Sequence, residues 1–233
     1  MIMAVDVSLK TLLEAGAHFG HQTRRWNPKM KPYIYGEQEG VHVFDLIKTK
    51  KSLEEALEVL TKASREGKII LIVGTKKQAK DKVVEMATDA GCFYVNERWL
   101  GGTLTNFSQM KKSTDRLVEM KQKLEKGEYK TYTKKERLKI ERDIARSERF
   151  FGGIVEMNAL PEVLIIIDTK RESTAVKEAL AKEVTTIAIV DSNSDPTKIT
   201  YPIPMNDDAT KAIEYVLDLF KEAIIEGKKK SKK

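Results

Sequence analysis

Short aliphatic runs alternate with amphipathic segments along most of this chain. The runs hold consecutive apolar residues, which is typical of strands buried on both faces of a sheet, and the segments between them repeat apolar residues at helical spacing. The predicted strands are residues 68–74, 92–95, 163–168 and 185–191, and the predicted helices are residues 49–66, 75–91, 172–183 and 207–226. This alternation predicts the α/β class, with a parallel sheet flanked by helices on both faces.

The N-terminal region has a different pattern. Ser8 can cap a short helix that ends near His18. Residues 18–33 read HFGHQTRRWNPKMKPY, which is too polar for a core and holds two prolines, so we expect a loop there. We call residues 18–33 the basic segment. Two short strands around a glycine-bearing turn then predict a β-hairpin over residues 32–45.

Residues 107–150 interrupt the alternation with two charged helical segments. Gly127 separates the segments, and Thr133 with Glu136 forms a capping box that starts the second one. Apolar residues form a narrow stripe on each segment, namely Met110, Leu117 and Leu124 on the first and Leu138, Ile140, Ile144 and Ala145 on the second. We predict a projecting antiparallel coiled-coil hairpin with arms of about 30 Å. The alternative is that both helices lie flat on the domain.

Charge is concentrated in three parts of the chain. Residues 24–31 carry four Lys or Arg and no acid, residues 111–149 carry fourteen against eight acids, and the ending KKKSKK carries five. The rest of the chain has a net charge of −8, although the whole has +7. This segregation favours a polyanionic partner over an ordinary solvated surface. The predicted division is an α/β domain from residues 1–106 and 151–227, the hairpin insertion at residues 107–150, and a disordered basic tail at residues 228–233.

No residue pattern supports catalysis, a cofactor or a metal site. Cys92 is the single cysteine, which excludes a disulfide framework and a cysteine zinc site. His18 and His21 flank Gly20, and no further ligand lies close by in the sequence, so we expect no zinc. We find no Ser/His/Asp set, no acid pair and no redox motif, and we therefore expect no enzymatic activity and no small-molecule substrate.

The loop after the first strand of the alternation reads GTKKQA from Gly74. It lacks the later glycines that a P-loop or a dinucleotide-binding loop requires, so we predict no nucleotide site. Lys76 and Lys77 stand near the start of the following helix. We interpret them as phosphate contacts, with ordinary exposed lysines as the alternative.

The stretch DSNSDP, from Asp191, begins like a calcium-binding loop. Pro196 occupies the position where such a loop needs glycine, which excludes an EF-hand. Asp168, Asp191 and Asp195 leave two alternatives, a Mg²⁺ site and an Asx-turn, and we favour the turn.

The basic segment and a second loop, NERWLGGTLTNF at residues 96–107, combine cations, a tryptophan and chain-breaking residues. Lys and Arg neutralise phosphates, and flat aromatic rings stack on bases or sugars. The alternative is that each loop is a packing loop with a buried Trp. The predicted RNA contacts are Arg24, Arg25, Trp26, Asn27, Lys29, Lys31, Lys76, Lys77, Arg98, Trp99, Asn106, Lys111 and Lys112.

Four stretches carry a family resemblance when they are taken in order. LLEAGAHFGHQTRRWNPKMKPYIYG, VGTKKQA, NERWLGGTLTNF and NSDP followed by IPMNDDA are similar to the bacterial small-subunit ribosomal protein S-two family. The similarity runs from about Ser8 to Gly227 and includes the hairpin. It implies a flavodoxin-like fold, binding to small-subunit rRNA, neighbouring ribosomal proteins, and docking of the mRNA-binding S-one protein nearby.

We expect from these observations a structural protein of the cytoplasmic ribosome. The opening residues lack the apolar core of a signal peptide, and the aliphatic runs are too short to cross a bilayer, so we expect no membrane partner. Two rival hypotheses are an α/β enzyme that binds a nucleotide or phosphate, and a scaffold that binds only proteins through its hairpin. The charge segregation favours RNA over both.

Overall fold

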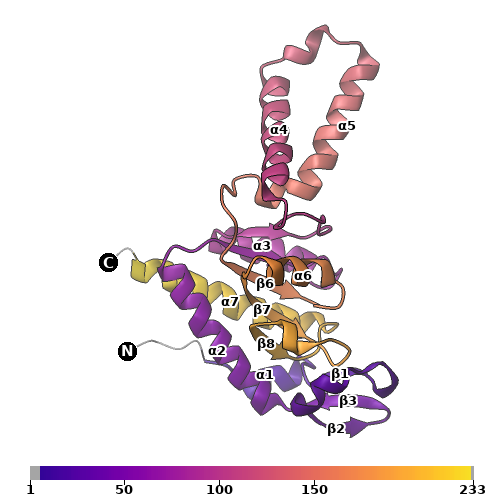
Figure 1. Cartoon of the computed structure of the whole chain (residues 1–233), viewed down its shortest axis with the longest axis vertical. Coiled ribbons are helices and arrows are strands. Elements are labelled where there is room, and N and C mark those ends of the chain that lie inside the picture. Colours follow the sequence, from indigo (N-terminus) through magenta and orange to yellow (C-terminus); the bar gives the residue numbers. More distant parts are fainter. Residues whose placement is uncertain (1–5, 232–233) are drawn as a thin grey trace.

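The computed structural model describes residues 6–231, with an α/β body at one end and a helical hairpin projecting from the other (Figure 1). The body holds a sheet in the order β5-β4-β6-β7-β8 in which every neighbouring pair is parallel. The strands are β4 (Ile70–Val73), β5 (Phe93–Val95), β6 (Val163–Ile167), β7 (Thr185–Val190) and β8 (Tyr201–Pro204). Counted from β4, this order is 2-1-3-4-5, which is consistent with a flavodoxin-like fold. The predicted α/β class with a parallel sheet is confirmed.

The sequence pattern missed strand β8. Its residues Pro202 and Pro204 lack the N–H donors of a sheet ladder, and prolines argue against a central strand. β8 pairs only with β7, at one edge of the sheet, where strand prolines are tolerated.

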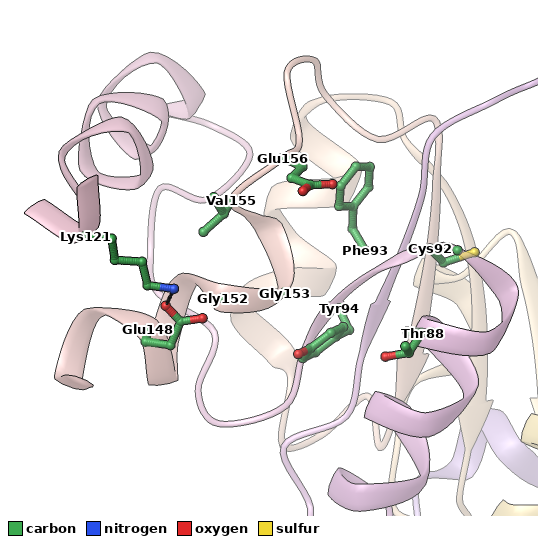
Figure 2. Close-up of a pocket in the computed structure, with 12 residues that line it drawn as sticks. Thr88, Cys92, Phe93, Tyr94, Lys121, Glu148, Gly152, Gly153, Val155 and Glu156 are labelled. Carbon is green, nitrogen blue, oxygen red and sulfur yellow. Dashed lines mark ion pairs between the residues drawn. The ribbon is translucent and has the colours of Figure 1, made fainter. Parts of the chain in front are cut away.

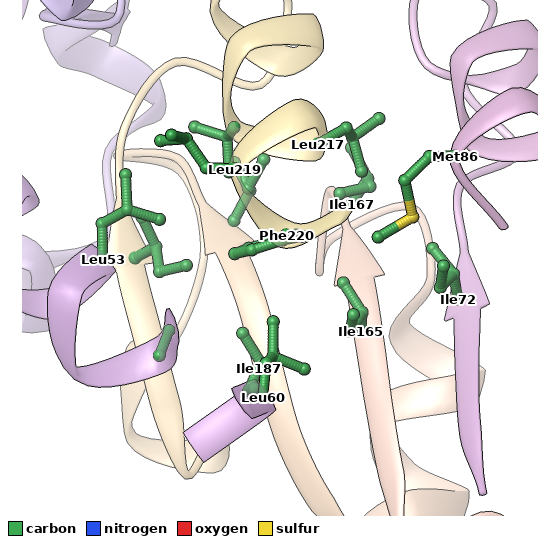
Figure 3. Packing of buried hydrophobic residues seen from close by; sticks show 14 of the residues in the cluster. Leu53, Leu60, Ile72, Met86, Ile165, Ile167, Ile187, Leu217, Leu219 and Phe220 are labelled. Atoms are coloured by element: carbon green, nitrogen blue, oxygen red, sulfur yellow. The ribbon is translucent and has the colours of Figure 1, made fainter. Parts of the chain in front are cut away.

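One face of the sheet is covered by three helices, α2 (Leu46–Arg65), α3 (Lys80–Ala90) and α7 (Thr210–Ser231). Their side chains interlock with alternate residues of the strands, as Figure 3 shows for Phe220 of α7 against Ile165 and Ile187. Asp45 starts α2 because its carboxylate accepts the N–H groups of the first turn. The continuous aliphatic runs follow from this arrangement, since both faces of the strands are buried.

On the other face a short helix, α6 (Ser173–Ala181), covers part of the sheet. The rest of this face is closed by loops, including Met30 of the basic segment and Trp99 of the second predicted RNA loop. Both loops therefore contribute to the core as well as to the surface.

The N-terminal residues form a small antiparallel sheet in the order β1-β3-β2. It consists of β1 (Phe19–Gln22), β2 (Ile34–Gln38) and β3 (Val41–Phe44), and it follows α1 (Leu9–Glu14), which Ser8 caps as predicted. Glu39 and Gly40 both have positive φ at the β2–β3 turn, as a two-residue hairpin of the right-handed twist requires. The basic segment is more regular than the predicted loop, because β1 is followed by the 3-10 helices η1 (Thr23–Arg25) and η2 (Pro28–Tyr33).

Two antiparallel helices, α4 (Phe107–Glu125) and α5 (Lys134–Phe151), form the projection, with η3 (Glu128–Thr131) between them. The capping box of Thr133 and Glu136 is present. Leu117 and Ile144 are buried near the base, whereas Leu124 is 40% exposed and Leu138 is 46% exposed towards the tip. The arms visibly separate there (Figure 1). The hairpin is present, but a continuous coiled-coil seam is not confirmed, because the apolar stripe is too sparse at the tip to hold the arms together.

A partly buried carboxylate fixes the base of the hairpin to the body. Glu97, in the loop after β5, accepts hydrogen bonds from Arg149 Nε and Nη2 at 2.8 and 2.6 Å and also pairs with Lys80 of α3. The Arg149 guanidinium and then the Lys80 ammonium lower the pKa of Glu97. The chain then enters η4 (Gly152–Ile154), where a Cβ on Gly153 would overlap the carbonyl oxygen of Tyr94.

The C-terminus differs from the predicted disordered tail. Helix α7 continues to Ser231, and Lys228 Nζ donates to the carbonyl oxygens of Ala90 and Gly91 at 2.7 and 2.9 Å. A cation is favourable at these final carbonyls of α3, which explains why the helix extends. Residues 232 and 233 of that tail lie outside the described residues. Among residues 6–231, no helix combines the length and hydropathy that a membrane span requires.

Candidate nucleic-acid interface

The basic segment is held against the carboxyl end of β7 by its backbone. The N–H of Asn27 donates to the Ser192 carbonyl at 2.7 Å, and the N–H of His21 donates to Ser192 Oγ at 2.8 Å. A Cβ on Gly20 would lie 2.8 Å from Ser192 Oγ, so this contact needs a glycine. With Met30 fully buried beneath it, the segment is a fixed support for its side chains.

Three of its cations are exposed to solvent, although Arg24 Nε donates to Gln22 Oε1 at 3.0 Å. Arg24, Arg25 and Lys31 are exposed, and none of them has a carboxylate within salt-bridge distance in the described part of the chain. Lys29 is different, because its Nζ pairs with Asp195 Oδ2 at 2.8 Å. Asn27 uses its side chain to cap η2, by accepting the N–H of Lys29.

Trp26 is only partly buried. Its ring packs against the ring of His42, with centroids 4.9 Å apart and the planes tilted by 42°. One part of the indole is therefore used in packing and the rest is accessible, so the prediction that Trp26 stacks on RNA stays a prediction.

Residues 96–106, which we call the Trp99 loop, are organised by a residue that the sequence interpretation missed. Both carboxylate oxygens of Glu178 accept hydrogen bonds from the loop. The donors are Trp99 Nε1 at 3.1 Å, the N–H groups of Gly102, Leu104 and Thr105 at 2.8, 2.9 and 3.0 Å, and Thr105 Oγ1 at 3.0 Å. Burial opposes ionisation of Glu178, but these hydrogen bonds outweigh it and lower its pKa. The sequence held one sign of this role, because Glu178 stands beside Ala175 and Ala179 on the apolar face of a predicted helix.

The predicted contact between Trp99 and RNA is corrected by this geometry. Trp99 is 6% exposed and its only polar atom is used by Glu178, so its ring faces the core rather than a base. Arg98 and Asn106, at the two ends of the Trp99 loop, are exposed.

Lys76, another predicted phosphate contact, is already paired with carboxylates of the protein. Its Nζ lies 2.6 Å from Asp207, 2.5 Å from Asp208 and 3.5 Å from Asp168, and its side chain is 11% exposed. Gly74, at the start of the same loop, packs against Val83, and a Cβ on Gly74 would lie 2.8 Å from Val83 Cγ2. The space beside Gly74 is therefore filled by the protein itself. Lys77 is exposed.

A cluster of acids surrounds Lys76 at the carboxyl edge of the sheet. His21, Asp191 and Asp207 each place a potential ligand atom within 4.8 Å of the others, so these three could hold a metal ion. The sequence interpretation had treated the histidine and the acids separately. Burial and the nearby carboxylates of Asp191 and Asp168 raise the pKa of Asp207 to about 7 despite Lys76. A hydrogen bond to Asp191 raises the pKa of His21.

The predicted contacts fall into two separate groups. The basic segment lies beside β7 and β8, whereas the Trp99 loop and the hairpin begin at β5, on the opposite edge of the sheet (Figure 1). Lys111 and Lys112 lie on the first turns of α4, where Lys111 pairs with Asp115 at 3.0 Å and Lys112 is exposed.

A cavity of about 430 Å³ opens between α3, β5 and the base of the hairpin. Figure 2 shows Tyr94 and Thr88 on one side and the ion pair of Lys121 with Glu148, which joins α4 to α5, on the other. Burial raises the pKa of the Cys92 thiol, at one end of the cavity, to about 11, so this cysteine is not an activated nucleophile.

The chain has relatives among known proteins. The family described as ribosomal protein S2 matches residues 12–227. A relative from Geotalea uraniireducens (strain Rf4), named small ribosomal subunit protein uS2, is 50% identical over 222 residues, which cover 95% of this chain and 87% of the relative. The basic segment, the acid cluster, the Trp99 loop and the hairpin all lie within the matched region. The chain therefore belongs to the ribosomal protein S2 family, a family of structural proteins of the small ribosomal subunit rather than enzymes.

Proposed function

We propose that this protein binds small-subunit rRNA through two exposed basic surfaces, as a structural component of the cytoplasmic ribosome. The first surface is formed by Arg24, Arg25 and Lys31 of the basic segment, with Trp26 beside them. The second is formed by exposed polar residues near the hairpin base, namely Arg98, Asn106 and Lys112. Lys29, Asn27 and Lys111 have weaker support, since they already have partners within the protein. Lys77 is exposed but belongs to neither of these two surfaces.

The observation that carries the proposal is the state of the cations on the basic segment. An exposed cation with no carboxylate partner has its full charge available to a phosphate, and a support fixed by backbone hydrogen bonds loses little entropy when RNA binds. Outside the three basic parts of the chain the net charge is −8, so the cations are concentrated on particular segments.

The family resemblance extends the proposal to protein partners. Neighbouring small-subunit proteins, and docking of the mRNA-binding S-one protein, would use surfaces that rRNA leaves uncovered. Co-sedimentation of the S-one protein with small subunits that contain or lack this chain tests that part.

A salt titration with small-subunit rRNA tests the RNA surface. Arg24→Ala with Arg25→Ala should weaken binding by about 1–3 kcal/mol for each lost phosphate contact and should lower the salt slope by about one unit for each. The matched control is Lys51→Ala with Lys62→Ala, which removes two exposed lysines from α2. Equal slopes for the two double variants would contradict the proposed surface.

Trp26→Ala separates stacking from charge. Loss of a stacked base should weaken binding by about 1–3 kcal/mol and leave the salt slope unchanged. If Trp26 acts only by packing on His42, the free variant will unfold at lower temperature, and the folded fraction will bind RNA as the original protein does.

A further inference from the structure

A second cavity, of about 170 Å³, lies at the carboxyl edge of the sheet between the loops that follow β6 and β7. It stands between the two proposed RNA surfaces. Asp195, on one side of the cavity, is paired with Lys29 of the basic segment. Lys177, on the other side, directly precedes Glu178, which holds the Trp99 loop.

The cavity wall is positively charged. Lys170, Lys177 and Lys198 line it, and all three are exposed. Asp195 is the only acid among the residues that line the cavity. It already accepts hydrogen bonds from Lys29 and Thr197, and Lys198 Nζ lies 4.0 Å from its Oδ2. Burial opposes its ionisation, but these partners lower the pKa of Asp195 to about 2, so it stays charged and occupied. The wall keeps an excess of positive charge.

The start of α6 adds donors to the same wall. The first N–H groups of a helix have no partner within the helix, and the N-cap residue Glu172 makes no side-chain capping bond here. Its carboxylate instead accepts the N–H of Thr75 at 3.3 Å and Thr75 Oγ1 at 2.5 Å. Ser173, the first residue of α6, lines the cavity, and the positive end of the helix favours an anion there.

An unpaired hydroxyl provides the independent sign of a ligand. Thr169 lines the cavity and is 7% exposed, and its Oγ1 is buried without a hydrogen-bond partner among the described residues. Buried hydroxyls in folded proteins are nearly always paired, because an unpaired one loses its hydrogen bonds to water. A hydroxyl can donate to an anionic oxygen that enters the cavity.

We propose that this cavity binds a phosphate group, held by Lys170, Lys198, Thr169 Oγ1 and the first N–H groups of α6. The phosphate is a phosphodiester of the RNA backbone that passes between the two basic surfaces, and this choice of source rests on the proposed function. Phosphate fits better than a carboxylate because the donors come from several directions and no planar guanidinium faces the cavity.

The test uses two variants of the full chain. Lys170→Ala with Lys198→Ala removes the charge, and its control, Lys182→Ala with Lys211→Ala, removes two exposed lysines elsewhere. Thr169→Val removes only the unpaired hydroxyl and should not disturb folding. In a salt titration with small-subunit rRNA, the first variant should bind about 10- to 100-fold more weakly and lose about one unit of salt slope, and Thr169→Val should bind more weakly at unchanged slope.

Inorganic phosphate gives a second arm that does not depend on RNA. Added phosphate should shift the NMR signals of the Thr169 and Ser173 amides in the original protein and not in the lysine variant. Shifts without any change in RNA affinity would identify a free phosphate as the ligand. The proposal is overturned if phosphate leaves both amides unshifted and both variants bind rRNA as the control does. Failure of the original protein to bind rRNA would count against the proposed function, and the phosphate arm would still decide the cavity.

Discussion

Glu178→Gln removes one negative charge and replaces one acceptor oxygen by a donor NH₂ group, while the size of the side chain stays the same. The amide oxygen can still accept from Trp99 and Gly102, but the amide NH₂ would face the N–H groups of Leu104 and Thr105. Each of these two donors left without an acceptor costs about 1–3 kcal/mol, so the variant should lose about 2–6 kcal/mol of unfolding free energy. For a chain of this size that is a fall in melting temperature of roughly 4–24 °C.

The assay is urea and thermal unfolding, followed by the fluorescence of Trp99 in a Trp26→Phe background. Glu214→Gln is the control, because Glu214 is exposed on α7 and its variant should stay within about 0.5 kcal/mol of the parent. Since the Trp99 loop carries Arg98, the Glu178→Gln variant should also bind rRNA more weakly. If both glutamine variants unfold alike, the hydrogen bonds to Glu178 do not stabilise the loop and the reasoning fails.

The pH dependence of the same protein gives a check with a definite sign. The pKa of Glu178 is lowered in the folded state, so its contribution to stability is present above the unfolded pKa and is lost as the pH falls through the folded pKa. The difference between the parent and Glu178→Gln should therefore be full at pH 7 and should shrink below about pH 4.

Three further predictions concern other parts of the fold. Gly153→Ala should destabilise the protein by about 1–3 kcal/mol in urea unfolding, because the added Cβ would overlap the Tyr94 carbonyl oxygen. A urea midpoint equal to that of the parent protein would show that the backbone at the hairpin base shifts to make room. Replacing residues 110–148 by a short Gly/Ser linker should leave a cooperative calorimetric transition but weaken incorporation into the subunit, and loss of that transition would place the hairpin in the core. The raised pKa of Asp207 makes folding less favourable as the pH rises from about 4 to about 7, and the raised pKa of His21 does so only above about pH 6.5. Asp207→Asn should therefore flatten the dependence between about pH 4 and 7, and an unchanged stability profile would contradict the assignment.

The sequence was a good guide wherever structure depends on neighbours along the chain. Aliphatic runs marked four strands, and the capping box at Thr133 marked the start of α5, because periodicity and capping are local. Strand β8 escaped, since tolerance of its prolines depends on a position at the sheet edge that no local pattern records.

The partners of polar side chains were beyond the reach of the sequence. Lys76 looked like a free phosphate ligand, yet it pairs with Asp207, which is 131 residues away in the chain. Trp99 was predicted to be accessible to RNA because its hydrogen-bond partner Glu178, 79 residues away in the chain, could not be recognised from the sequence. A single sequence gives the type of each side chain, whereas the fold decides whether its charge is already neutralised.

The clamp of Glu97 on Arg149 has a consequence at a distance. Helix α4 has 19 residues and is about 28 Å long, so a rotation of about 10° at its base would move its far end by about 5 Å. That displacement is the width of one side chain, enough to exchange one set of contacts at the tip for another. The contacts of Glu97 with Arg149 and Lys80 therefore help to fix the orientation of the hairpin relative to the body. A partner that competed for Glu97 would change the position of the hairpin tip without contacting the tip.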